Sequence, residues 1–288
     1  MAGRKAKIIY GILAVLIYGI LAGVFVGKSI WLPGEKTYTD TETEYDMVML
    51  GDSILGRVRD ETGIPYQVAA ALDITVYNGA LGGTCMGRLE QTGYANEMKD
   101  VLSLVSLSKS IVTKDFRMQK LVELNENGTE YFAETIEQLS RIDFSKVKLL
   151  MLGYGVNDYH AGERIYNEED PYDEYTYIGA LTSSVRMLQN TYPDMRIVLL
   201  TSPYTWYTNE GLTCEEYVLG GNVLEDYVDA ALEAAEALGV EIIDLYEDVF
   251  PHDTWEDWQR YSVDGLHPNE EGRKLLSQII IEYLEDDE

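Results

Sequence analysis

The chain of 288 residues is long enough for one large domain or two small ones, and its 46% hydrophobic content predicts a packed core. The 50 acidic and 22 basic residues give a formal net charge of −28, so the chain should be repelled by phosphate backbones and nucleic-acid binding is not expected. Two cysteines and three histidines are too few for a disulfide scaffold or a histidine-rich metal centre, and we expect neither a metal nor a cofactor. A bond between Cys85 and Cys214 stays open, because an extracellular location would permit it.

Residues 8–26 form an uncharged apolar run of 19 residues. As a helix this run would span about 28 Å, close to the thickness of the hydrocarbon core of a bilayer. Three cations precede the run and one follows it, which predicts a cytoplasmic tail and an external body. We therefore expect residues 1–28 to hold a tail and a single-pass transmembrane signal anchor in the cell membrane, and residues 29–45 to be a linker. A cleaved signal peptide, which would leave a secreted protein, is the alternative.

Over residues 46–288, short β-branched or aliphatic runs alternate with longer helical patterns. This alternation predicts one α/β domain, a parallel sheet with helices on both faces. Several of the runs are apolar on consecutive residues, which is typical of strands buried on both faces. The expected strands are residues 46–50, 74–77, 147–152, 196–201 and 240–245. The expected helices are residues 65–72, 96–107, 131–142, 176–191, 223–238 and 268–284.

Ligands of such sheets bind beyond the carboxyl ends of the strands, and the first strand is followed by Gly51-Asp52-Ser53. A serine at a strand-to-helix turn can be held above the sheet with its hydroxyl exposed, and Gly51 would permit the sharp turn. Ser53 is therefore a candidate nucleophile, although the same three residues also occur in ordinary turns. The segment lacks the Gly-x-Ser-x-Gly elbow, so the α/β-hydrolase family is not supported.

The second and third strands are followed by possible donors to an oxyanion. Gly82 and Gly83 can bring a bare backbone N–H close to a ligand, although a flexible turn is the simpler interpretation. After the third strand, the Asn157 amide can donate a hydrogen bond, and Asp158 can tie down the loop backbone. If the strand order is 2-1-3-4-5, Ser53 and Asn157 follow neighbouring strands at the point where the connections diverge and face one crevice.

A candidate base lies near the C-terminus, where Asp264 and His267 are three residues apart. This spacing lets the carboxylate accept a hydrogen bond from the imidazole Nδ1–H, which leaves Nε2 free as a base. Pro268 and Asn269 are expected to start the last helix. The other two histidines, His160 and His252, lack an aspartate at this spacing and are expected to be surface or loop residues.

Together the four segments resemble the SGNH hydrolases, also called the GDSL esterase/lipase family, in which Ser, Gly, Asn and His blocks follow in this order. The resemblance covers residues 46–284 and implies a flavodoxin-like three-layer α/β/α fold with a five-stranded parallel sheet. It implies a nucleophile, an orienting acid and a general base, which map to Ser53, Asp264 and His267. It also implies an oxyanion hole, which maps to Ser53, Gly83 and Asn157, with Gly82 as the alternative glycine. The chain has Ile54 where the family has leucine, and both side chains should face the core.

The resemblance implies a serine esterase. The expected external location and the aromatic loops favour acetyl or short-chain esters on carbohydrate or cell-envelope substrates. Lipid esters, as for a lipase or lysophospholipase, and O-acyl transfer to a glycan are the alternatives, and a non-catalytic binding module is a third. The aromatic side chains are concentrated in an acidic, tyrosine-rich segment over residues 154–177, and more follow the fourth strand. These rings would either stack on a substrate or pack the loops on each other.

Overall fold

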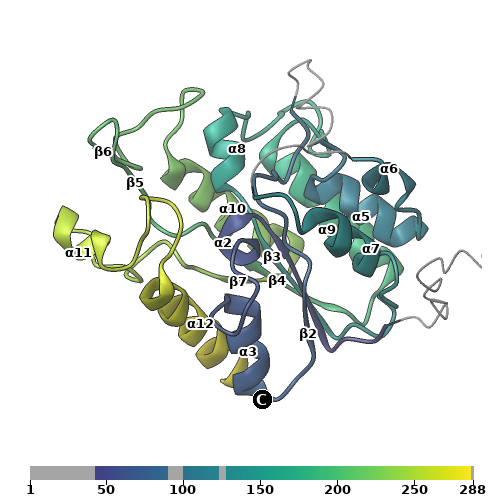
Figure 1. The fold of residues 1–288 in the computed structure, drawn as a ribbon. Coiled ribbons are helices and arrows are strands. Elements are labelled where there is room, and N and C mark those ends of the chain that lie inside the picture. Colours follow the sequence, from purple (N-terminus) through teal and green to yellow (C-terminus); the bar gives the residue numbers. More distant parts are fainter. Residues whose placement is uncertain (1–42, 90–99, 123–127, 287–288) are drawn as a thin grey trace, which may run out of the picture. The chain divides into compact units, whose positions relative to one another are not determined.

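The computed structural model describes residues 43–89, 100–122 and 128–286. Five strands form one parallel sheet in the order β2-β1-β3-β4-β7 (Figure 1). This is the predicted order, so β1 and β3 are neighbours at the switch point. The strands are β1 (Met47–Gly51), β2 (Val76–Asn78), β3 (Leu149–Gly153), β4 (Arg196–Leu200) and β7 (Glu241–Ile243).

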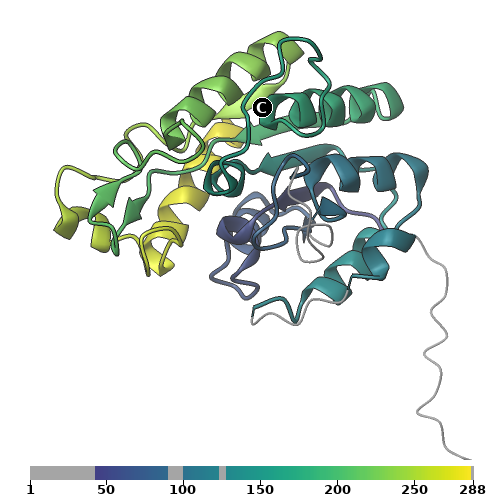
Figure 2. The same cartoon turned by 90° about the horizontal axis from the view of Figure 1, so that it is seen from above.

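Helices cover both faces of the sheet (Figures 1 and 2). On one face α3 (Ile64–Leu72) packs against α12 (Glu270–Glu285). On the other face α9 (Tyr177–Thr191) contacts two further helices, α5 (Leu104–Thr113) and α10 (Leu224–Leu238). At the β2 edge, the Tyr77 hydroxyl donates to the Thr135 carbonyl of α7 (Phe132–Leu139) at 3.0 Å. The predicted three-layer fold is therefore confirmed.

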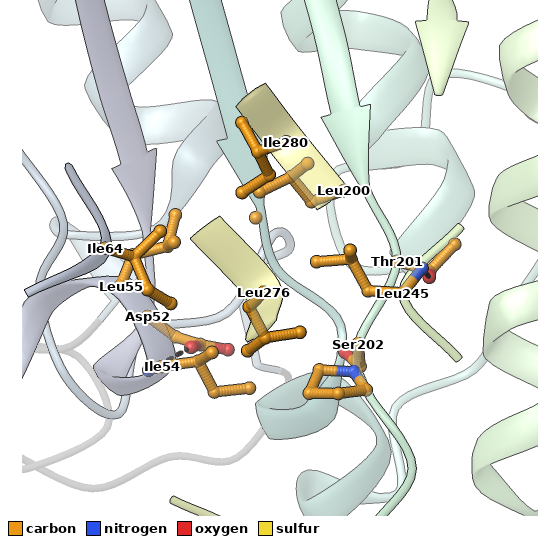
Figure 3. Close-up of a pocket in the computed structure, with 12 residues that line it drawn as sticks. Asp52, Ile54, Leu55, Ile64, Leu200, Thr201, Ser202, Leu245, Leu276 and Ile280 are labelled. Atoms are coloured by element: carbon orange, nitrogen blue, oxygen red, sulfur yellow. Dashed lines mark hydrogen bonds between the residues drawn. The ribbon is translucent and has the colours of Figure 1, made fainter. Parts of the chain in front are cut away.

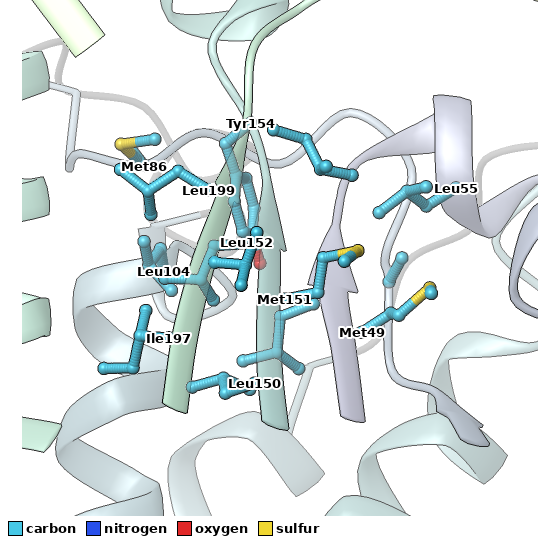
Figure 4. Packing of buried hydrophobic residues seen from close by; sticks show 14 of the residues in the cluster. Met49, Leu55, Met86, Leu104, Leu150, Met151, Leu152, Tyr154, Ile197 and Leu199 are labelled. Atoms are coloured by element: carbon cyan, nitrogen blue, oxygen red, sulfur yellow. The ribbon is translucent and has the colours of Figure 1, made fainter. Parts of the chain in front are cut away.

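The core is built from strand residues that are apolar on both faces, as the consecutive aliphatic runs predicted. Every residue of β1 is buried, and Leu150, Met151 and Leu152 of β3 are fully buried beside it. Figure 4 shows these side chains packed between the sheet and the helices. The sheet therefore provides a rigid floor for the loops that follow its strands.

The structure differs from the sequence prediction in the segment after β2. A helix was expected over residues 96–107, but α5 begins only at Leu104, and residues 96–99 lie outside the described ranges. The side chain of Ser103 accepts the N–H of Ser106 and caps the helix start. Several short elements were not predicted, because they are too short to show a period. They are α6 (Arg117–Lys120), α8 (Val156–Ala161), α11 (Trp255–Gln259) and the hairpin of β5 (Trp206–Tyr207) and β6 (Leu212–Thr213).

The tyrosine-rich segment over residues 154–177 contributes mainly to packing. Tyr154, Tyr159 and Tyr177 are almost fully buried in the core. The ring of Tyr177 meets that of Tyr227 edge to face, with centroids 5.3 Å apart. The interpretation in which these rings pack the loops is therefore correct for the three buried tyrosines.

Two expectations that depend on an extracellular location are the disulfide bond and the membrane segment. Cys85 and Cys214 are both buried and free, so the bond that stayed open is not formed. The predicted membrane segment at residues 8–26 and most of the predicted linker lie outside the described residues. Among the described residues, no helix combines the length and the apolar character that crossing a bilayer requires.

Candidate active site

Ser53 is the first residue of α2 (Ser53–Gly56), directly after β1. The Asp52 carboxylate accepts the N–H of Ile54 at 2.9 Å and caps this short helix. Gly51 was expected to permit the turn, but its φ is not left-handed. A Cβ at Gly51 would lie 2.6 Å from the Gly153 carbonyl oxygen, so the glycine is required for the close approach of β1 and β3.

Ser53, His267 and Asp264 form a continuous chain of hydrogen bonds. Ser53 Oγ lies 2.9 Å from His267 Nε2, and His267 Nδ1 lies 2.7 Å from Asp264 Oδ2. The second carboxylate oxygen of Asp264 accepts the backbone N–H of His267 at 2.9 Å and that of Leu266 at 3.2 Å. Because a carboxylate only accepts hydrogen bonds, it favours the proton on Nδ1, which leaves the Nε2 lone pair for the serine.

The pKa of Asp264 reflects opposing influences. Partial burial raises it, but the hydrogen bonds from the His267 backbone and imidazole and from the Leu266 N–H lower the pKa to about 2. Arg57 Nη1 lies 3.4 Å from Asp264 Oδ2, at the exposed side of the carboxylate. The acid is therefore ionised throughout the neutral range and available to orient the imidazole.

The loop that carries His267 is held by its own backbone. The Ser262 hydroxyl donates to the His267 carbonyl and accepts the N–H of Gly265, each at 3.0 Å. Gly265 has φ +106°, a left-handed conformation that glycine adopts without strain. Asn269 then caps α12 by accepting the N–H of Gly272 at 3.0 Å, as the predicted helix start requires.

The two glycines after β2 differ in what their N–H groups do. The Gly82 N–H donates to the Tyr131 hydroxyl at 2.9 Å and is therefore occupied. Gly83 has φ +74°, and its N–H forms no hydrogen bond within the described part of the chain. The N–H of Ser53 is likewise unbonded among the described residues. The glycine donor that remains available is Gly83.

Asn157 is the second residue of α8 and enters the site from β3. Gly155, with φ +135°, makes the preceding turn, and a Cβ there would lie 2.8 Å from the Tyr177 hydroxyl. The Asn157 amide donates one hydrogen to the Thr84 carbonyl at 3.2 Å, which fixes the side chain. A primary amide has two hydrogens, so one remains for a ligand.

These groups line one open cleft of about 350 Å³. Leu266 is the one aliphatic side chain among its described lining residues, and the remainder are polar, aromatic or glycine. Arg57, Thr129 and Tyr131 were not predicted, because they belong to no motif and come from segments with weak periodicity. The described lining residues are Ser53, Arg57, Gly82, Gly83, Gly128, Thr129, Tyr131, Asn157, Leu266 and His267.

Comparison with known proteins gives the family. The model of the GDSL-like Lipase/Acylhydrolase family matches residues 49–275, from β1 into α12. The chain belongs to this family. It is an SGNH-type hydrolase, and its Ser, Gly, Asn and His segments all fall within the matched range. No match was found among proteins with curated functions.

Solved structures share the fold of this GDSL-like hydrolase at low sequence identity. A protein from Lactobacillus plantarum is 18% identical, with a TM-score of 0.59, and the match covers 85% of this chain and 98% of that one. A protein from Chitinophaga pinensis described as "a possible lipase" is 15% identical, with a TM-score of 0.52, and the match covers 83% and 97% of the two chains. At these identities the similarity shows a common fold alone.

In this GDSL-like hydrolase a buried acid pair joins the glycine loop to α8. The Asp158 carboxylate accepts the N–H groups of Met86 at 2.8 Å and Gly87 at 3.1 Å, so it ties down the loop backbone as predicted. Glu163 is buried close to Asp158 and packs where a side chain on Gly87 would collide with its carboxyl group. Burial and the charge of Asp158 raise the pKa of Glu163 far above its usual range. Both effects favour the protonated, neutral form of Glu163 beside the Asp158 carboxylate.

A third buried carboxyl group belongs to Asp52, the residue that precedes Ser53 in the chain. Asp52 borders a small cavity of about 10 Å³ that is otherwise lined mainly by aliphatic side chains from α2, α3, α12, β4 and the segment after β7 (Figure 3). Burial raises the pKa of Asp52 to about 7, against the lowering effect of the Ile54 N–H, and the charge of Asp158 adds to the rise.

The remaining histidines of the hydrolase are bound to other partners. His160 Nε2 lies 2.6 Å from the Tyr207 hydroxyl, and burial lowers the pKa of this imidazole, with a further contribution from His267. His252 stacks on Tyr204 at a centroid distance of 3.9 Å. Within the described ranges, no group of three or more histidine, cysteine or acidic residues is arranged to hold a metal ion.

Proposed function

We propose that this hydrolase is a serine esterase that cleaves acetyl or other short-chain esters on carbohydrate or cell-envelope substrates through an acyl-Ser53 intermediate. The observation that carries the proposal is the unbroken hydrogen-bond chain from Ser53 Oγ to His267 at 2.9 Å and on to Asp264 at 2.7 Å. This chain opens into the cleft beside the unoccupied donors of Gly83 and Asn157.

In the first half of the reaction, Ser53 Oγ attacks the ester carbonyl carbon while His267 Nε2 takes the hydroxyl proton. The negative charge that develops on the carbonyl oxygen is received by the N–H groups of Ser53 and Gly83 and by the Asn157 amide. His267 then gives its proton to the leaving alcohol oxygen as the ester C–O bond breaks. Asp264 holds the imidazole in the required tautomer and stabilises its positive charge.

In the second half, water replaces the alcohol. His267 takes a proton from the water while its oxygen attacks the acyl carbon of acyl-Ser53. The same donors stabilise the second oxyanion. The proton returns to Ser53 Oγ as the carboxylic acid leaves, and the site is restored.

The cleft favours a small acyl group and a polar alcohol. Leu266 is its one aliphatic side chain among the described lining residues, so a long acyl chain would bury little apolar surface there. The net charge of −28 disfavours anionic polymers relative to neutral glycans. The lining therefore supports short-chain esters over lipid esters, and the charge supports neutral carbohydrates over anionic polymers.

We further propose that residues 1–28 are a tail and transmembrane signal anchor, residues 29–45 a linker, and residues 46–288 an extracellular hydrolase domain. The apolar run at residues 8–26 and the cations on its two sides support this arrangement. The full-length protein should fractionate with membranes. Protease added to intact cells should then remove the extracellular domain. A soluble product that begins near residue 29 would instead show a cleaved signal peptide.

The proposed activity is tested with p-nitrophenyl esters of increasing chain length and with an O-acetylated oligosaccharide, each with and without added free sugar. We expect kcat/KM to be highest for acetate and the product to be free acetic acid. Ser53→Ala should abolish turnover with an unchanged melting temperature. A preference for octanoate would support a lipase, acetyl transfer to the free sugar would support an acyltransferase, and full activity of Ser53→Ala would refute the assignment of the nucleophile.

A further inference from the structure

A second cavity of about 300 Å³ opens beside the catalytic cleft. Its walls come from the start of α3, from β2 and from one face of α7, where Glu134 and Gln138 are one helical turn apart. No step of the proposed reaction uses it. The described lining residues are Arg59, Tyr66, Tyr77, Tyr131, Glu134, Thr135 and Gln138.

Tyr131 is the wall that the two cavities share. Its hydroxyl accepts the Gly82 N–H at 2.9 Å. A methyl group added at Gly82 would lie 3.3 Å from this hydroxyl oxygen and 3.4 Å from Ser53 Cβ, so both border the same small space. The Tyr131 side chain therefore stands between a substrate whose ester lies at Ser53 and the second cavity.

The walls of the second cavity are held in place without a ligand. The Arg59 guanidinium lies 4.6 Å from the centroid of the Tyr131 ring and donates to the carbonyls of Asn78 at 2.5 Å and Ala80 at 3.3 Å. Tyr77 is fixed by the bond from its hydroxyl to α7. A preformed site loses less conformational entropy when it binds a ligand.

The chemistry of the walls selects the ligand. The rings of Tyr66 and Tyr77 offer apolar surface with polar edges, whereas one face of Tyr131 is covered by Arg59. The Glu134 carboxylate and the Gln138 amide offer acceptors and donors for hydroxyl groups. The Arg59 guanidinium is engaged by the Asn78 and Ala80 carbonyls, so the Glu134 carboxylate opposes an anionic ligand. The polar groups oppose an acyl chain. A flat molecule with C–H faces and several hydroxyls fits this combination, and the volume is at the lower end for small-molecule sites.

We propose that this cavity is a subsite for a neutral sugar ring, which holds the glycan next to the residue whose ester is cleaved. The proposal rests on the proposed function, because it supplies the carbohydrate part of the substrate. The Tyr66 side chain, which is 40% exposed at the mouth of the cavity, would stack on the sugar ring, and Gln138 would bind its hydroxyls.

The test compares Tyr66→Ala and Gln138→Ala with the wild type on two substrates, p-nitrophenyl acetate and O-acetylated xylotetraose. Neither side chain is buried, so both variants should fold. We expect unchanged kcat/KM for p-nitrophenyl acetate and a KM for the oligosaccharide that rises about three- to tenfold. Tyr172→Ala is the matched control, because Tyr172 is 55% exposed and lines neither cavity.

Calorimetric titration of Ser53→Ala with unmodified xylotetraose and chitotetraose measures the subsite without turnover. Binding that is weakened by the added Tyr66→Ala change supports the subsite. No binding of either sugar, or equal binding with and without Tyr66, overturns it even if acetylated sugars are cleaved. Cleavage of p-nitrophenyl acetate without cleavage of the acetylated sugar would instead refute the substrate class of the proposed function, while the titration still decides on the subsite.

Discussion

At Asp264, one carboxylate oxygen serves two partners. Oδ2 accepts the His267 Nδ1–H at 2.7 Å and lies 3.4 Å from Arg57, while Oδ1 is occupied by two backbone N–H groups. The carboxylate therefore cannot rotate without losing several hydrogen bonds at once. Because the acid is partly exposed, its contribution lies more in the orientation of the imidazole than in a strong buried charge.

Asp264→Asn tests this orientation. An amide at this position can present its NH₂ group to Nδ1, which favours the tautomer with the proton on Nε2 and removes the base. We expect kcat on p-nitrophenyl acetate to fall on the order of 10²- to 10⁴-fold, with an unchanged melting temperature. A rate within twofold of the wild type would mean that Asp264 does not orient His267.

Asn157→Ala tests the oxyanion donor. The variant loses one donor that acts on the charge of the transition state, so kcat should fall about 10²- to 10³-fold while KM changes little. Steady-state kinetics on p-nitrophenyl acetate measure both constants. A rise in KM alone would assign Asn157 to substrate binding and contradict the proposed role.

At the scale of elements, the site depends on how closely β1 and β3 approach each other. Gly51 pairs with Gly153 at the ends of these strands, and a Cβ at Gly51 would collide with the Gly153 carbonyl oxygen, whereas one at Gly153 would meet the end of the Leu55 side chain at 2.9 Å. The two loops that leave this point carry Ser53 and Asn157. Their separation is therefore set by backbone packing in the sheet and is independent of the loops themselves.

Two alanine substitutions separate this packing from the cleft. Gly51→Ala places a methyl group 2.6 Å from a backbone oxygen and should destabilise the fold by about 1–3 kcal/mol. Gly82→Ala has no backbone collision but fills the space between Tyr131 and Ser53, so it should lower kcat/KM about tenfold or more at nearly unchanged stability. Thermal unfolding and kinetics on both variants check the contrast, and equal losses of stability would contradict it.

The sheet and the segments that follow its strands could be predicted from the sequence, because consecutive apolar runs and turn residues are local signals. The start of α5 and the short helix α8 could not, because a single capping residue decides the first and the second is too short to show a period. The choice of Gly83 over Gly82 came from the family resemblance, because the contact that occupies the Gly82 N–H comes from Tyr131, which lies 49 residues further along the chain. Arg57 and Thr129 carried no motif at all.

Considered as a whole molecule, the chain combines a net charge of −28 with carboxyl groups buried under its active site. Asp52, Asp158 and Glu163 are all buried, and burial is the main cause of the raised pKa of each. The raised pKa of Glu163 keeps its proton bound to higher pH in the folded state than in the unfolded chain, where it is released near pH 4.5. The folded state therefore binds more protons than the unfolded state above that pH.

The sign of this difference predicts alkaline destabilisation. Between the unfolded and the raised folded pKa of Glu163, the free energy of unfolding should fall by up to about 1.4 kcal/mol for each pH unit as the pH rises. Glu163→Gln keeps a donor towards Asp158 but does not titrate, so its stability should fall less steeply. Denaturant unfolding at pH 6, 7.5 and 9 measures the slopes.

Glu168→Gln is the control for this comparison, because it removes an exposed carboxylate of the same loop and should leave the slope unchanged. Parallel slopes for the wild type and Glu163→Gln would show that the alkaline loss comes from other groups.

The hydrogen bond between Ser53 and His267 joins residues 214 positions apart. The serine follows the first strand of the sheet, and the histidine directly precedes the last helix, which packs against α3 near the serine. With the proposed roles, a nascent or truncated chain that stops before residue 267 contains the serine without anything to activate it. The enzyme is therefore inactive during synthesis until residue 267 has been added and the domain has folded. During refolding, hydrolysis of a chromogenic ester would begin only after the segments that carry Ser53 and His267 have come into contact. The lag before hydrolysis would therefore measure when this contact forms.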